Sequence, residues 1–114
     1  MDDIDLNFKT FPRGDARRYL LVLLTIDQLQ NKEATTYSIA VAITATRAEV
    51  ERAIQALVTQ FGVVFRREPT ARRADYSRYF IEDWGILNRK KAEAFLRNQH
   101  EGAIVDGKPA SPFA

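Results

Sequence analysis

The stretch from residue 37 to residue 68 most constrains the fold, because its apolar spacing changes phase once and then ends at a glycine. Ile39, Ala40 and Ile43 fall at i, i+1 and i+4, on one face of a short helix. A second apolar stripe follows at steps of three and four. It consists of Val50, Ala53, Ile54, Leu57, Val58 and Phe61. We therefore expect two crossed helices, each with one buried face.

Local chemistry explains why the phase breaks between the two stripes. Thr46 is followed three residues later by Glu49, the pattern of a capping box, in which the hydroxyl accepts from an amide of the first turn and the carboxylate accepts from the cap's own N–H. Gly62 follows the last apolar position and can take the left-handed conformation that ends a helix. The apolar run VVF after it is typical of a strand. The pattern predicts helices at about 36–44 and 46–61, followed by a strand.

The residues before this stretch predict one more helix. Asp15 can cap a helix that runs to about residue 31, in which the run from Leu20 to Leu24 is apolar without interruption. This helix is apolar around more than half of its circumference, so it is either central in the core or shared with a second subunit. Residues 1–14 alternate apolar and polar side chains, which fits an edge strand or an extended arm packed on a helix.

Residues 63–84 read as two strands around a loop that contains a proline, a β-hairpin rich in arginine. The planar fork of arginine suits phosphate oxygens better than the point charge of lysine. The charged residues at its centre are Arg66, Arg67, Arg72, Arg73 and Arg78, against only Glu68 and Asp75. Asn88 can cap a last helix at about 89–99. Residues 100–114 have no period and are expected to form a flexible tail.

Composition limits the remaining choices. With 114 residues, 46% of them hydrophobic, the chain can bury one core, so residues 15–99 are expected to form a single domain. The absence of cysteine excludes disulfides and thiolate metal sites and permits a reducing setting. The acidic N-terminus is unlike a signal peptide, and the longest apolar run is too short to span a bilayer. We expect a soluble cytoplasmic protein with no membrane partner.

Little in the sequence supports catalysis. His100 is the only histidine, so a histidine triad or a multi-histidine metal site cannot form. The serines lack a nucleophile-elbow setting, and no glycine loop for phosphate occurs. Glu82 and Asp83 are adjacent on an expected strand, where they point to opposite faces. We expect no enzyme activity, no cofactor and no metal site. The net charge of +2 does not by itself identify a nucleic-acid binder.

The central residues resemble the winged helix-turn-helix superfamily of DNA-binding proteins. The segment IAVAIT, a short turn and then EVERAIQALVTQFGVVFRRE are similar to the DNA-binding core of MarR-like and GntR-like bacterial or phage regulators. The step from Leu57 to Gly62 is similar to the end of their recognition helix, whereas Ala45 stands in the turn where the family often has a glycine. The resemblance covers about residues 15–84. It implies a mainly α member of the α+β class, with a three-helix core, a small β-hairpin as the wing and a C-terminal helix.

In that superfamily the recognition helix lies in the major groove, and the wing touches the neighbouring backbone or minor groove. By position, the resemblance implies two sets of DNA-binding residues. The recognition helix would supply Thr46, Arg47, Ala48, Arg52 and Gln55, and the wing would supply Arg66, Arg67, Arg72, Arg73 and Arg78. Double-stranded DNA is thus the expected partner, bound sequence-specifically by a regulator of transcription. A homodimer is expected, because the first helix has surplus apolar surface and one recognition helix covers only a half-site. Whether a small-molecule effector exists stays open.

Other interpretations of the same residues remain open. Exposed residues of the 46–61 helix can be ordinary solvated side chains, and the arginine hairpin can be a strand edge protected against pairing. Glu49 and Glu51 would repel phosphates unless Glu49 is engaged in the cap or Glu51 accepts from a cytosine amino group. The alternative function is therefore a winged-helix module that docks on another protein and binds no DNA.

Overall fold

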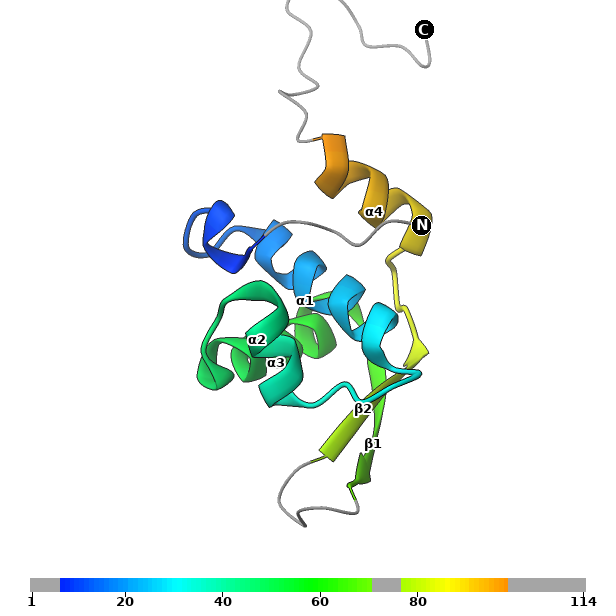
Figure 1. Cartoon of the computed structure of the whole chain (residues 1–114). Helices are drawn as coiled ribbons and strands as arrows, with labels where there is room; N and C mark the ends of the chain where they lie inside the picture. Colours follow the sequence, from blue (N-terminus) through cyan, green and yellow to red (C-terminus); the bar gives the residue numbers. More distant parts are fainter. Residues whose placement is uncertain (1–6, 71–76, 99–114) are drawn as a thin grey trace, which may run out of the picture.

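The computed structural model describes residues 7–70 and 77–98, which form four α-helices and one β-hairpin (Figure 1). The elements are α1 (Ala16–Leu29), α2 (Thr36–Ile43), α3 (Arg47–Phe61), β1 (Val64–Pro69), β2 (Ser77–Asp83) and α4 (Arg89–Asn98), preceded by the 3-10 turn η1 (Phe8–Thr10). The expected α+β class with one small hairpin is confirmed. Three predicted segments lie outside the described residues: the first part of the N-terminal arm, the hairpin tip and the tail.

The helices begin and end where the sequence places caps. Thr46 and Glu49 form the predicted capping box: the Thr46 hydroxyl accepts from the Glu49 N–H at 3.0 Å, and the Glu49 carboxylate accepts from the Thr46 N–H at 2.9 Å. Asp15 and Asn88 each accept from an N–H of the first turn of α1 and α4. Gly62 ends α3 in the left-handed conformation, with φ 73°. These local predictions are confirmed.

The turn between α2 and α3 reverses the chain without a glycine. Thr44 takes the left-handed conformation, with φ 57° and ψ 55°, and is the only non-glycine residue with positive φ in the described part of the chain. Behind it, the Ala45 N–H donates to the Ala40 carbonyl at 2.9 Å. The sequence has Ala45 where the family often has a glycine, but the residue with the strained backbone is Thr44, one position earlier.

Helix α1 lies at the centre of the core and packs against α2, α3, α4, β2 and η1 (Figure 1). Every residue from Leu20 to Ile26 is buried within the chain. Of the two alternatives for this helix, the core position is therefore correct, and its apolar surface no longer supports a homodimer. Among the described residues, the large apolar side chains that stay exposed lie elsewhere: Tyr37, Val41, Val58, Val64, Ile86 and Phe95.

The segment before α1 is not a strand where it is described. Phe8 and Phe11 are both buried in the core, and the 3-10 turn η1 brings them to the same side. In a strand, Phe8 and Phe11 would point to opposite faces. The burial of both aromatic rings therefore favours the 3-10 turn over the strand that the alternating pattern suggested. The Arg18 Nε–H fixes the segment to α1 by donating to the carbonyls of both phenylalanines, at 3.1 and 3.0 Å.

The hairpin has one face toward the helices and one toward solvent. Strands β1 and β2 are antiparallel, with Arg67 opposite Tyr79 and Arg66 opposite Phe80. Tyr79 is buried and meets Phe65 edge to face, so this face closes the core. The free edge of β2 is covered by the chain before α2, where the Ala34 carbonyl accepts from the Tyr79 N–H at 2.8 Å.

The base of the hairpin is fixed to the end of α3 by a close backbone contact. Gly85, just after β2, has φ 65° and lies against Gly62, so that a Cβ on Gly85 would overlap the Phe61 carbonyl oxygen and the backbone of Gly62. The Ile86 N–H donates to the same Phe61 carbonyl at 3.0 Å. This contact sets the position of the hairpin beside α3.

Candidate nucleic-acid interface

The outward face of α3 carries most of the predicted recognition residues. Its inner stripe is buried and consists of Val50, Ala53, Ile54, Ala56 and Leu57. Arg47, Ala48, Arg52 and Gln55 are exposed on the outer side. Thr46 precedes the helix as its N-cap, and its hydroxyl oxygen is already engaged with an amide of the first turn.

The two carboxylates of α3 have different environments. Glu49 is held in the capping box, and the hydrogen bond from the Thr46 N–H lowers the pKa of its carboxyl below the usual value. Glu49 is therefore engaged in the cap, as considered from the sequence, and its carboxylate stays ionised while the Thr46 N–H offsets part of its charge. Glu51 is exposed and lies on the side of α3 that faces the hairpin.

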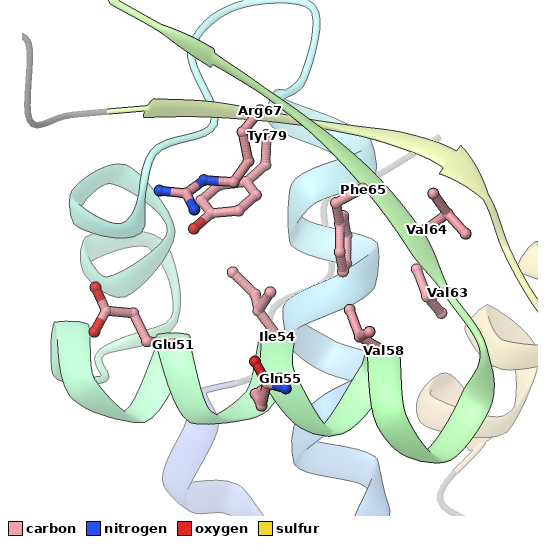
Figure 2. A pocket seen from close by; sticks show the side chains of 9 residues that line it. All are labelled: Glu51, Ile54, Gln55, Val58, Val63, Val64, Phe65, Arg67 and Tyr79. Atoms are coloured by element: carbon pink, nitrogen blue, oxygen red, sulfur yellow. The ribbon is translucent and has the colours of Figure 1, made fainter.

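A groove of about 480 Å³ separates α3 from β1 (Figure 2). Glu51 from α3 and Arg67 from β1 lie at one end of it, and Val58 and Val64 lie at the other (Figure 2). The guanidinium of Arg67 is 5.5 Å from the centre of the Tyr79 ring, a cation–π contact. The hairpin flank of α3 thus has one charged end and one apolar end.

The other described arginines of the hairpin are paired on its solvent face. Arg66 lies 3.3 Å from Glu68 and 3.4 Å from Glu82, and Arg78 lies 3.7 Å from Glu68. Both guanidinium groups also lie over the Phe80 ring. These two arginines therefore carry little uncompensated charge, and they face away from the groove that holds Arg67. The described arginines of the predicted wing therefore do not form a single surface. Arg72 and Arg73, which were also predicted for it, lie outside the described residues.

The opposite flank of α3 holds arginines that the sequence analysis missed. A pocket of about 360 Å³ lies between η1, the start of α1 and α3, and Arg13, Arg18 and Arg52 line it together with Tyr19. Arg13 and Arg18 belong to the basic segment PRGDARR, far from Arg52 in the chain. That segment was the available signal, but only the packing of α1 on α3 brings the three together.

Within residues 7–70 and 77–98, no three His, Cys, Asp or Glu side chains gather so that they could hold a metal ion. None of the helices in these ranges has the length and apolar content needed to cross a bilayer.

Comparison of the chain with models of protein families, with curated proteins and with solved structures finds no match. What this interface binds must therefore follow from its own geometry and charge.

Proposed function

We propose that this chain binds double-stranded DNA sequence-specifically, with α3 in the major groove. The observation that carries the proposal is the outward face of α3, which presents Ala48, Arg52 and Gln55 opposite a buried stripe. The capping box at Thr46 and the left-handed Gly62 fix both ends of the helix, so the backbone presents these positions on one defined face. An α-helix with its side chains has about the width of the major groove.

The exposed side chains suit the edges of base pairs. Gln55 can pair in a bidentate way with an adenine, whereas Arg52 lies on the flank of α3 that lines the pocket beside η1. Ala48 lets the helix approach closely and can contact a thymine methyl group. Glu51 can accept from the amino group of a cytosine, which turns its negative charge from an obstacle into a source of specificity.

Sequence-specific binding by a domain of this size fits a regulator of transcription of the winged helix-turn-helix kind that works in the cytoplasm. A homodimer would read two half-sites, since one α3 covers only one of them. Apolar surface for such a dimer exists near α4, where Ile86 is 80% and Phe95 is 46% exposed.

A second candidate function is docking on another protein through the groove beside α3. It is favoured by the apolar end of that groove, where Val58 and Val64 are 43% and 52% exposed. The ion pairs that occupy Arg66 and Arg78 also favour it, because they reduce the charge that the hairpin offers to phosphates. Such a module would bind no DNA.

The two functions are separated by measuring how the full chain binds labelled duplexes. Fluorescence anisotropy is measured first with random duplexes of about two helical turns and then with duplexes selected from a random pool. A protein that contacts phosphates loses affinity steeply as salt rises, whereas a docking module shows no such binding. A palindrome recovered from the pool would also support the homodimer. An unenriched pool together with no salt-dependent binding would refute the proposal.

Two variants test whether α3 itself reads the bases. Glu51→Ala and Gln55→Ala should each lose about 1–3 kcal/mol of preference at one base pair of the selected duplex. Lys90→Ala is the control, because Lys90 is exposed on α4 and its loss removes a charge away from α3. If both α3 variants keep the full preference of the control, α3 does not read the sequence.

A further inference from the structure

We propose that the pocket formed by Arg13, Arg18 and Arg52 binds a phosphodiester of the DNA backbone, on the side of α3 away from the hairpin. This inference rests on the proposed function, because it takes α3 to lie in the major groove. The sequence alone assigns backbone contacts to the hairpin arginines, so the proposal moves a principal phosphate contact to the opposite flank.

The geometry of the groove supports a contact on this flank. A helix in the major groove nearly fills its width of about 12 Å, so the two phosphate backbones run along both sides of the helix. One side of α3 faces the hairpin, and the other faces the pocket between η1 and α1. A backbone that passes the second side meets Arg52 from α3 and the arginines of the N-terminal segment together.

The charges of the two flanks differ. On the hairpin, Arg66 and Arg78 are within 4 Å of carboxylates. Arg67 forms no ion pair among the described residues, but it shares the groove beside α3 with the exposed carboxylate of Glu51.

Within residues 7–70 and 77–98, Arg13, Arg18 and Arg52 form no ion pair within 4 Å. The charge of Arg18 does help to lower the pKa of the Glu49 and Asp15 carboxyls, so Arg13 and Arg52 are the arginines of the pocket with the least compensation. Arginine without a carboxylate partner is the group that can exchange water and counterions for a phosphate.

The pocket is also built to hold its arginines in place. Arg18 donates through Nε to the carbonyls of Phe8 and Phe11, and its guanidinium lies 4.5 Å from the centre of the Phe8 ring. These contacts fix its side chain. Its two terminal nitrogens have no acceptor among the described residues. The one carboxylate on the wall is Glu49, which is engaged with the Thr46 N–H at 2.9 Å. Preorganised donors bind an anion with a smaller loss of side-chain entropy.

The test compares the salt dependence of duplex binding for Arg13→Ala and Arg66→Ala, which change the net charge equally. Each lost phosphate contact makes the slope of log affinity against log salt less steep by about 0.9. Arg13→Ala should show this change and weaken binding to all sequences alike, whereas Arg66→Ala should change the slope much less. Arg13→Lys keeps the charge and should keep the slope. Arg13 is exposed, so its replacement leaves the core intact, unlike replacement of Arg18.

The source of the phosphate is distinguished by NMR of the arginine Nε–H groups, with the duplex and with inorganic phosphate at equal phosphate concentration. Shifts of Arg18 and Arg52 with the duplex alone support a backbone site, and equal shifts with inorganic phosphate overturn it. If the wild type binds duplexes with a salt slope that Arg13→Ala leaves unchanged, the pocket assignment fails while the proposed function stands. If no duplex binds in a salt-dependent way, the proposed function fails as well.

Discussion

The close contact between Gly85 and the end of α3 makes Gly85→Ala the most informative single change to the scaffold. Both Gly85 and Gly62 have positive φ, but only at Gly85 does an added Cβ meet backbone atoms, namely the Phe61 carbonyl oxygen and Gly62 itself. At Gly62 the nearest atom to an added Cβ is 3.8 Å away, an ordinary contact distance. Gly62→Ala is therefore a matched control for the backbone conformation without the overlap.

The expected loss at each position follows from these contacts. An L-residue in the left-handed region costs about 1–2 kcal/mol, and replacing glycine by alanine returns about 0.4–1 kcal/mol through the unfolded chain, so Gly62→Ala should lose about 1 kcal/mol. Gly85→Ala has the same net cost of about 1 kcal/mol for its positive φ. In addition, the loop must move away from α3. This movement breaks the 3.0 Å hydrogen bond from the Ile86 N–H to the Phe61 carbonyl, which is worth about 1 kcal/mol. It also disturbs tight packing, at a further cost of about 1–3 kcal/mol. The total for Gly85→Ala is about 3 kcal/mol or more.

The measurement is urea unfolding, followed by fluorescence of the single tryptophan, Trp84, and by far-ultraviolet circular dichroism. Trp84 is half-buried beside Gly85, so its fluorescence reports the loop directly. Far-ultraviolet circular dichroism shows whether the helices unfold in the same transition. A loss for Gly85→Ala no larger than that for Gly62→Ala would refute the reasoning, because it would mean that the overlap is relieved without moving the loop.

Two further changes test the turn between α2 and α3 and the capping box that begins α3. Thr44→Gly removes a β-branched residue at φ 57° and should raise the free energy of unfolding by up to about 1 kcal/mol. Thr44→Ala should bring no such gain. If urea unfolding ranks the two variants the other way, the backbone at Thr44 is not strained. Glu49→Gln keeps an acceptor for the Thr46 N–H but removes the carboxylate, whose pKa is lowered from 4.5. The wild type should be more stable than this variant above that pH and should lose the advantage as the pH falls through the lowered pKa. A difference in stability that does not change with pH would contradict this expectation.

The parts of the fold that the sequence predicted well depend on neighbours along the chain. The cap at Thr46 needs only Glu49 three residues later, and the helix end at Gly62 needs only a residue that tolerates positive φ. These interactions form within one helical turn, so the sequence contains all of their partners. The 3-10 turn before α1 was missed because its conformation depends on burial of Phe8 and Phe11 in a core assembled from the whole chain.

The candidate site was less predictable because charge compensation acts across strands and between elements. The sequence shows the hairpin arginines close to Glu68, but it does not show that Arg66 also pairs with Glu82 on the neighbouring strand. Arg13 and Arg52 come to one pocket only because α1 packs on α3. A count of arginines along the chain therefore shows neither the ion pairs of Arg66 nor the pocket that gathers Arg13 and Arg52.

A net charge of only +2 is compatible with a surface that binds phosphates, because the arginines that form ion pairs are not the arginines of the pocket. If the three arginines of the pocket are the main phosphate contacts, the slope of log affinity against log salt is about −2.7 for one protomer and about −5.4 for a homodimer that uses both pockets. Between about 50 and 200 mM salt these slopes correspond to losses of roughly 40-fold and 2,000-fold. The salt slope therefore reports two unknowns at once, and Arg13→Ala separates them: its change is about 0.9 if one pocket contacts the duplex and about 1.8 if two do.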